Sequence, residues 1–595
     1  MPLGIELAAA WVPALPVATI AAELAASLDV LETTLRDVPE RHRSARAVFE
    51  HSWNLLAAEE QTLFRQLAVF HGGFTWQAAQ QIAGAKLGIL ARLVDKSLLR
   101  IDRDGRYDTH ELLRQFAAEK LYTEPGAEEA MRERHSVFYL EWLQSKNSEL
   151  KGPQQLHALD EVEREFENVR GAWQWALQRG QWERLRKTLV AFSLFIAVRS
   201  RQLDAIALLQ QVLDTSAAAK SSGEESTQRQ GLEAYALTLQ APFFGWIGQI
   251  DKYVSCLERS RAAVEQYGTP YEVALHCQLY ASSRVDLKEA RAMYERSVAL
   301  FQAIGANWEA AWALNGLGDF VLRLGQKLEA RGIHEEALAS YRTSGEHVGI
   351  ADTLRSLGEV AYALGNYDES RRLVAESLAI QQAIGQKIMI VQCLDVLSEI
   401  ACAQGEFAEA EARCRQQFAI LHDLGNREQV SWTLAQLGAA VLAQGRLGDA
   451  ATLLAEALTL AEERANPRGI ALAHKELGSL ALKQGAHDTA RRHWRTAIGV
   501  AWRVQDRAHL LVTLDALIGL ATLMAQADNV ERAVEVLTLV RRAASIDRRT
   551  ETKAEQLLAE LERRLSPGRF AAAQARGRAL VLDAVVETIL TEGMA

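Results

Sequence analysis

The stretch ADTLRSLGEVAYALGNYDESRRLVAESLAIQQAIG, residues 351–385, recurs in altered form every 40 residues along the chain. Its central glycine has equivalents at equal steps, namely Gly325, Gly365, Gly405, Gly445 and Gly485. A leucine eight residues earlier keeps the same step, at Leu317, Leu357, Leu397, Leu437, Leu477 and Leu517. A period this regular predicts a stack of equivalent helical hairpins.

The remaining columns of the repeat describe how the hairpins should pack. A small residue follows the leucine in five of six units, and alanine or serine stands five residues after the central glycine, as at Ala330 and Ser370. Small residues let helices approach closely, and a glycine suits the left-handed turn between them. A second glycine column, Gly305, Gly345, Gly385 and Gly425, is expected to end the second helix of each hairpin.

This order of leucine, small residue, glycine and alanine resembles the tetratricopeptide repeat in a long form. The resemblance covers roughly residues 271–545, and we assign residues 231–545 to the repeats. The fold class it implies is all-α, a tetratricopeptide-repeat superhelix (α-solenoid). The last segment, residues 546–595, is expected to form capping helices, including one helix after the Pro567–Gly568 break.

Composition limits the kinds of partner. The net charge of −10 argues against a nucleic-acid surface over most of the 595 residues. Five cysteines without a CxxC pair fit reduced, buried thiols better than disulfides or zinc, so the cytoplasm is the expected compartment. No apolar run approaches the ~20 residues of a membrane span. The opening also lacks the basic stretch of a signal peptide.

Residues 41–125 have a different pattern, with three or four helical segments followed by LLRI and RYDTH around Asp104–Gly105. That dipeptide suits a tight hairpin, so we expect an N-terminal winged-helix domain with a small β-wing. Its last helix should start after Asp108, with Asp108 as the cap. Residues 126–230 are expected to be a helical adapter that ends in a polar loop over 214–230.

Two short motifs resemble the end of a bacterial STAND signalling ATPase, in which a nucleotide-binding core, a winged helix and a repeat sensor follow one another. The opening PLGIELAAA resembles the GLPL motif, with Pro2 at its characteristic position, so residues 1–40 look like a remnant of the core's helical subdomain. Residues 109–111 resemble the MHD motif, which implies that His110 senses the β-phosphate of ADP. The run LRDVPERHRSARAVFEHSWNLL is similar to the winged helix of LuxR- and AfsR-type regulators.

The chain lacks the sequence features of catalysis. It has no GxxxxGK[ST] and no acidic strand end for magnesium, so ATP or ADP is expected only in a parent with the core. No nucleophile, base and orienter fall into a recognisable order, so we expect no enzyme activity. His334, His474 and His493 have no ligand-spaced partners, so no metal site is expected.

The candidate binding surface is the inner face of the solenoid, where a protein, a peptide or a small effector could be recognised. By the STAND resemblance, an upstream NTPase core is expected as a separate partner. By the tetratricopeptide resemblance, the inner-face groove is lined by residues five and two before the repeat leucine and two and five after it. The candidates are Trp312, Asn315, Asp319, Asp352, Arg355, Glu359, Tyr362, Gln392, Asp395, Glu399 and Trp432. These columns vary while the packing columns do not, and tryptophans beside charges make good anchors. The alternative is a merely solvated face.

Three functions follow as hypotheses. The first is the non-catalytic sensor half of a STAND-type ATPase, in which an effector on the repeats shifts the winged helix and frees His110 from ADP. The second is a free-standing scaffold for protein partners. The third is a DNA-binding regulator, although the candidate recognition helix KLGILARLVDKS offers only Lys86, Arg92 and Lys96 as cations.

Overall fold

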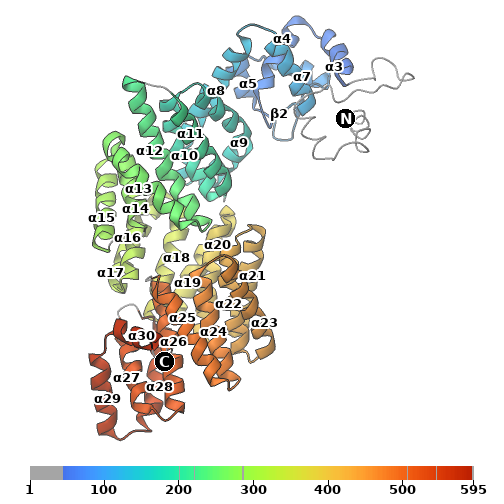
Figure 1. The fold of residues 1–595 in the computed structure, drawn as a ribbon. Coiled ribbons are helices and arrows are strands. Elements are labelled where there is room, and N and C mark those ends of the chain that lie inside the picture. Colours follow the sequence, from blue (N-terminus) through green and yellow to red (C-terminus); the bar gives the residue numbers. More distant parts are fainter. Residues whose placement is uncertain are drawn as a thin grey trace. The chain divides into compact units, whose positions relative to one another are not determined.

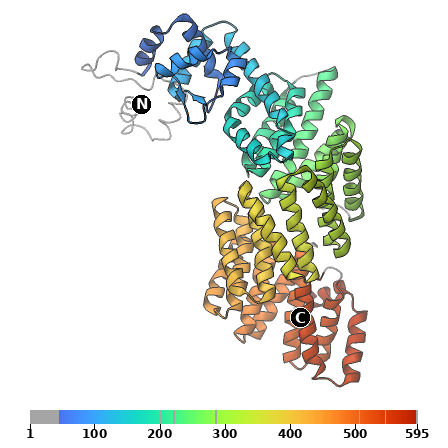
Figure 2. The same cartoon turned by 180° about the vertical axis from the view of Figure 1, so that it is seen from behind.

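The structure is a computed structural model that describes residues 45–199, 201–219, 222–283, 287–504, 507–543 and 546–591 (Figures 1 and 2). Pro2 and the proposed core remnant, residues 1–40, lie outside the described residues. The chain divides into two compact units. The first holds the described residues up to Leu150 with Gln154–Phe195 and Leu208–Ala236, and the second holds the remainder.

The first unit begins with short helices and one small sheet. Its elements are α3 (Ala45–Asn54), α4 (Ala58–Gln66), η3 (Leu67–Val69), α5 (Trp76–Ala83), α6 (Leu87–Asp95), β1 (Arg100–Ile101), β2 (Tyr107–Asp108) and α7 (Glu111–Tyr122). The strands pair antiparallel, with Arg100 opposite Asp108. Oδ1 of Asp102 accepts the N–H groups of Asp104 and Arg106 at 2.9 Å. Gly105 has a φ of 78°, so the expected hairpin is present.

The predicted cap of α7 is wrong. The helix starts at Glu111, and its cap is His110, whose Nδ1 accepts the N–H of Leu112 at 3.3 Å. Asp108 is held in β2, so its backbone is extended and too early in the chain to cap. Glu111 instead pairs with Arg114 at 2.7 Å.

The polar segment 214–230 was expected to be a loop and is mostly helical. Longer helices follow α7, namely α8 (Ala127–Ser145), η4 (Glu149–Lys151), α9 (Gln155–Gln178), α10 (Trp182–Val198), α11 (Gln202–Ala218) and α12 (Gly223–Trp246). Arg229 of α12 donates to the carbonyl of Ser216 at 2.8 Å and pairs with Glu233 at 2.7 Å. This hydrogen bond satisfies a carbonyl at the end of α11. The sequence of 214–230 has no apolar period, so it gave no sign of the helix or of this contact.

The second unit confirms the 40-residue period. Two helices precede the regular repeats, α13 (Ile250–Tyr267) and α14 (Pro270–Ala281). The first helices of the hairpins are α16 (Asn307–Arg323), α18 (His347–Leu364), α20 (Lys387–Gln404), α22 (Arg427–Ala443), α24 (Pro467–Lys483) and α26 (Arg507–Gln526). The second helices are α15 (Leu287–Ala303), α17 (Lys327–Ser344), α19 (Tyr367–Ile384), α21 (Phe407–Asp423), α23 (Leu447–Glu463), α25 (His487–Trp502) and α27 (Val530–Arg541). Each packs on the next, as Figure 1 shows for α18 to α25.

The columns have the packing roles expected of them. Leu357, Leu397 and Leu437 are buried, and the central glycines have positive φ, as at Gly365 with 85°. A Cβ on Gly358 would lie 2.3 Å from Cγ2 of Val374, so a small residue is needed there. Where the second glycine column would next fall, Ala465 adopts a φ of 49°.

Three helices follow the repeats, α28 (Arg548–Glu562), α29 (Pro567–Ala579) and α30 (Leu582–Thr591). The single helix expected after Pro567 is therefore two. Besides α26 and α27, α28 contacts α18, far earlier in the chain. Among the described residues one stretch, His509–Gln526, is long and apolar enough to cross a membrane, and 61% of it is buried, as in a core helix.

Candidate functional site

The first helices of the repeats bring five of the predicted residues around one cavity. Arg355, Glu359, Gln392, Asp395 and Trp432 line a space of about 430 Å³, together with residues of the turn between α12 and α13. They come from α18, α20 and α22, because residues three or four apart share one face of a helix.

A smaller cavity of about 140 Å³ shares two lining residues with the larger one. Trp432 and Arg468 line both spaces, and Tyr362 and Glu399 line only the smaller one. We call the two spaces together the inner-face cavity. They lie within the second unit.

An arginine covers the central tryptophan of this cavity. The guanidinium carbon of Arg468 lies 3.8 Å from the centroid of the Trp432 ring. Arg468 is the second residue of α24. Its backbone N–H donates to Oδ1 of the cap residue Asn466 at 3.1 Å, and Arg468 is exposed. It has no ion pair within 4 Å in the part of the chain that the structure describes.

Arg355 is neutralised locally, whereas two neighbouring carboxylates are not. Arg355 pairs with Asp352 at 3.2 Å and with Glu359. Asp395 and Glu399, one turn apart on α20, have no ion pair among the described residues. The free energy of burying these carboxylates is therefore not offset by a direct salt bridge.

The pKa values of both carboxyls respond to this environment. Burial, followed by the charges of Asp395 and Asp547, raises the pKa of Glu399 to about 8. Burial also raises the pKa of Asp395, while the charge of Arg468 and hydrogen bonding from the side chains of Gln436 and Trp432 oppose the shift. Oδ1 of Asp395, Nε1 of Trp432 and Oε1 of Gln436 are buried, without a hydrogen-bond partner of normal geometry among the described residues.

The start of α28 closes one side of the cavity. Asp547 and Arg549 line the smaller space, and Lys327 donates to the carbonyl of Ile546 at 3.0 Å. Asp515 of α26 receives Lys553 at 3.0 Å and Lys475 at 3.4 Å. Although burial raises the pKa of Asp515, these two lysines and Arg549 bring it well below its usual range.

Other predicted groove residues are not among those that line these spaces. Asn315 is buried, and its Oδ1 lies 2.8 Å from Nδ1 of His334. Asp319 lies 3.4 Å from Nε2 of the same histidine, whose pKa is lowered to about 4 by burial. Trp312 stacks on Trp308 with ring centroids 6.5 Å apart. The first repeat therefore uses these side chains in packing.

Sequence reasoning missed Arg468, Gln436, Asp547 and Arg549. Arg468 lies one turn before the groove columns, and Asp547 and Arg549 come from beyond the repeats. Only an extension of the column comparison to the first turn of each helix could have indicated Arg468.

In the first unit, His110 is partly exposed at the start of α7. Burial, then nearby positive charge from Arg100, lowers the pKa of His110. Because Nδ1 accepts the N–H of Leu112, the neutral ring carries its proton on Nε2.

Two of the three cations of the candidate recognition helix are already paired. Glu60, buried on α4, binds Lys96 at 2.6 Å and Arg92 at 2.7 Å. Hydrogen bonds from Lys96, the backbone of Ala57 and Arg92 lower the pKa of Glu60 to about 2. This arrangement weakens the DNA-binding hypothesis.

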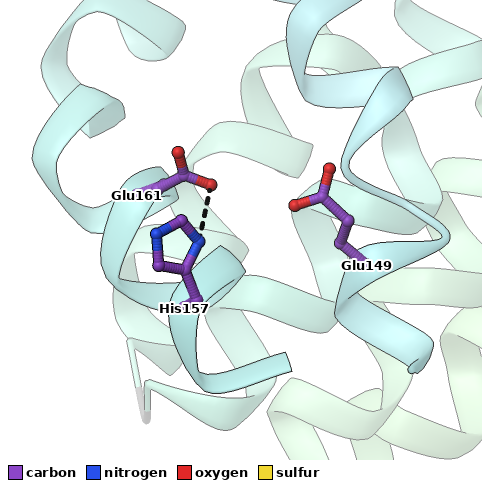
Figure 3. A group of neighbouring side chains, drawn as sticks. All are labelled: Glu149, His157 and Glu161. Carbon is purple, nitrogen blue, oxygen red and sulfur yellow. Dashed lines mark ion pairs between the residues drawn. The ribbon is translucent and has the colours of Figure 1, made fainter. Parts of the chain in front are cut away.

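Within the described residues, one group could by its geometry hold a metal ion. Glu149, His157 and Glu161 place one ligand atom each within 4.8 Å of one another (Figure 3). Nδ1 of His157 lies 3.2 Å from Glu161. However, the ammonium of Lys146 lies 2.8 Å from Glu149 and 2.7 Å from Glu161, so a cation already neutralises both carboxylates. The group is best described as an ion-pair cluster.

The structure also brings together two repeat histidines that the sequence did not pair. Nδ1 of His474 and Nδ1 of His493 are 2.9 Å apart, and burial lowers the pKa of His474 to about 4. One neutral ring can donate to the other at this distance.

Comparison with known proteins supports the repeat assignment. The tetratricopeptide-repeat family model matches residues 284–343, 309–383, 349–416 and 391–463. The fold is an α-solenoid of tetratricopeptide repeats. A Mycobacterium tuberculosis protein named as an HTH-type transcriptional regulator is 33% identical over 190 residues, which are 30% of this chain and 21% of that protein. The match spans about a fifth of its length, so that protein's activity is not thereby shown for this chain.

Two solved structures are also similar. A STAND protein with a tetratricopeptide-repeat sensor from Pyrococcus horikoshii is 16% identical, with 76% of this chain and 70% of that chain covered and a TM-score of 0.38. A Rap protein complexed with competence and sporulation factor is 13% identical, with 65% and 99% covered and a TM-score of 0.48.

Proposed function

We propose that this chain is the non-catalytic sensor part of a STAND-type signalling ATPase in the cytoplasm. Its repeats bind an effector in the inner-face cavity, and the N-terminal winged helix relays the nucleotide state. The observation that carries the proposal is the cavity itself. It brings together Trp432 and the side chains of Arg468, Asp395 and Glu399, which have no ion pair among the described residues. The repeat leucines around them are buried in the core.

Effector binding can be tested on the purified chain. Fractions of small molecules and peptides from cell extract should raise the melting temperature of the wild type, because a ligand that binds only the folded state stabilises it. Trp432→Ala should lose most of this shift. Leu328→Ala, at an exposed position on α17, is the matched control and should keep it. Equal shifts in all three proteins would place the ligand elsewhere.

The relay part of the proposal concerns His110. With Nδ1 accepting from the backbone, Nε2–H is left to donate to a phosphate oxygen of a nucleotide held by an upstream core. In a polypeptide that joins these residues to such a core, His110→Ala should shorten ADP retention. His157→Ala, an exposed histidine of the same unit, is the control. Unchanged retention in His110→Ala would remove the sensor role.

Coupling between the two parts needs one further condition. The effector must bind the ADP state and the exchanged state with different affinity, because equal affinity shifts no equilibrium. ADP release measured with and without the active extract fraction tests this condition. A release rate that the fraction leaves unchanged would favour a free-standing scaffold.

A further inference from the structure

The inner-face cavity holds acidic and basic side chains that have no ion pair. Asp395 and Glu399 lack an ion pair, and so do Arg468 and Arg549, within the residues that the structure describes. Other charged residues that line the same spaces are paired, as Arg355 is with Asp352 and Lys475 is with Glu476 at 2.7 Å. The four unpaired side chains are therefore the ones left to interact with a ligand.

Neutral polar atoms of the same walls are also unsatisfied. Nε1 of Trp432 can donate and Oε1 of Gln436 can accept, and both atoms are buried without a partner of normal geometry among the described residues. A buried polar atom without a partner destabilises the folded state. A ligand with matching groups would recover this free energy.

The charges indicate which ligand fits. A purely cationic ligand near Asp395 would also meet Arg468, and a purely anionic ligand at Arg468 would meet a carboxyl group. Arg468 lines the larger space with Asp395 and the smaller space with Glu399. A ligand with both charges avoids either repulsion. The larger space, about 430 Å³, falls in the range of small-molecule sites.

We propose that the inner-face cavity binds a zwitterionic ligand with a free ammonium and a free carboxylate, as in an amino acid or a short peptide. The ammonium lies toward Asp395 and Glu399, and the carboxylate toward the guanidinium of Arg468. Arg468 is assigned to the carboxylate because it is exposed and lines both spaces, whereas Arg549 lines only the smaller one. The proposal rests on the function proposed above and names the chemistry of its effector.

The probes are two defined pools, the free proteinogenic amino acids and a set of tetrapeptides with free termini. Binding to the full chain is measured by thermal shift and then by calorimetry with the active member. The same member is tested with its amino group acetylated and, separately, with its carboxylate amidated. Each block should weaken binding about tenfold or more, because each removes a charge-assisted contact. The pool that is active distinguishes amino acids from peptides.

Two variants show which side chain binds the ligand's amino group and which binds its carboxylate. Acetylation of the ligand's amino group should weaken binding to Asp395→Asn much less than it weakens binding to the wild type. Amidation of the ligand's carboxylate should likewise weaken binding to Arg468→Gln much less. Circular dichroism melts of both variants report whether they fold, and the comparison of blocked with unblocked ligand in the wild type needs no variant.

Equal binding of blocked and unblocked ligands would overturn the proposal, as would binding of neither pool. In both cases the proposed function stands if an extract fraction still stabilises wild type but not Trp432→Ala. If no extract fraction stabilises the wild type more than Trp432→Ala, the proposed function is contradicted.

Discussion

The guanidinium of Arg468 lies over the indole of Trp432, 3.8 Å from the ring centroid, at the junction of the two spaces of the inner-face cavity. Such a stack at an exposed site contributes about 0.5–1 kcal/mol. Arg468→Ala should therefore lower the free energy of unfolding by no more than about 1 kcal/mol, while it abolishes the thermal shift caused by the effector. Urea melts and thermal shifts measure the two effects. A large loss of stability with intact binding would make the stack structural only.

Ala465 occupies a left-handed turn where the glycine column would place its next member. Its side chain is exposed, so strain in the backbone is the main effect of substitution. Ala465→Gly should stabilise the protein by about 0.5–1 kcal/mol, the left-handed strain being partly offset by unfolded-state entropy. Ala455→Gly, at an exposed position inside helix α23, is the control and should not stabilise. Chemical denaturation compares them, and equal effects would show that Ala465 is unstrained.

The glycine positions explain why the repeats could be predicted from sequence. Spacing fixes both the turn and the helix lengths when each hairpin packs only on its neighbours. Gly325 and Gly365 therefore located helix ends to within a residue or two. The segment 214–230 could not be predicted in this way, because Arg229 makes a tertiary contact with the end of another helix.

Glu399 should make stability depend on pH in the neutral range. Its pKa is raised from 4.5 to about 8, so the folded state binds more protons than the unfolded state between these values. The free energy of unfolding should therefore fall as the pH rises from about 5 to 8. The charged or titratable groups that face it come from α18, α20, α24, α26 and the start of α28, namely Glu359, Tyr362, Asp395, Cys402, Arg468, Lys475, Glu476, Asp515, Asp547 and Arg549.

Glu399→Gln should flatten that profile and be more stable than the wild type at pH 8, by about 1–2 kcal/mol after allowance for solvent screening. Glu336→Gln, exposed on α17, is the control. Urea melts at pH 5, 6.5 and 8 measure the difference. If the free energy of unfolding of the wild type varies with pH no more than that of Glu399→Gln, Glu399 keeps an ordinary pKa.

Glu60 should act in the opposite direction. Its pKa is lowered to about 2, so its stabilising effect is complete above its ordinary pKa of 4.5 and is lost as the pH falls toward 2. Glu60→Gln should cost about 1–3 kcal/mol at pH 7, because Arg92 and Lys96 lose their charged partner. The gap to the wild type should close in acid. Glu59→Gln, exposed on the same helix, should be near neutral at both pH values.

The candidate site was only partly predictable. Repeat columns identified Arg355, Asp395 and Trp432 because each projects from the same face of its helix. They could not show that Asn315 is used by His334, or that Arg549 enters the cavity from beyond the repeats. Those facts depend on how the last helices pack on earlier ones, which no local pattern records.

Hydrogen exchange of the full chain, with and without the active extract fraction, tests the central claim that the repeats bind their effector on the inner face. The account predicts slower exchange in α20, α22 and the first turn of α24, with little change in the second helices α21 and α23. Protection confined to those second helices, or to the first unit, would contradict it.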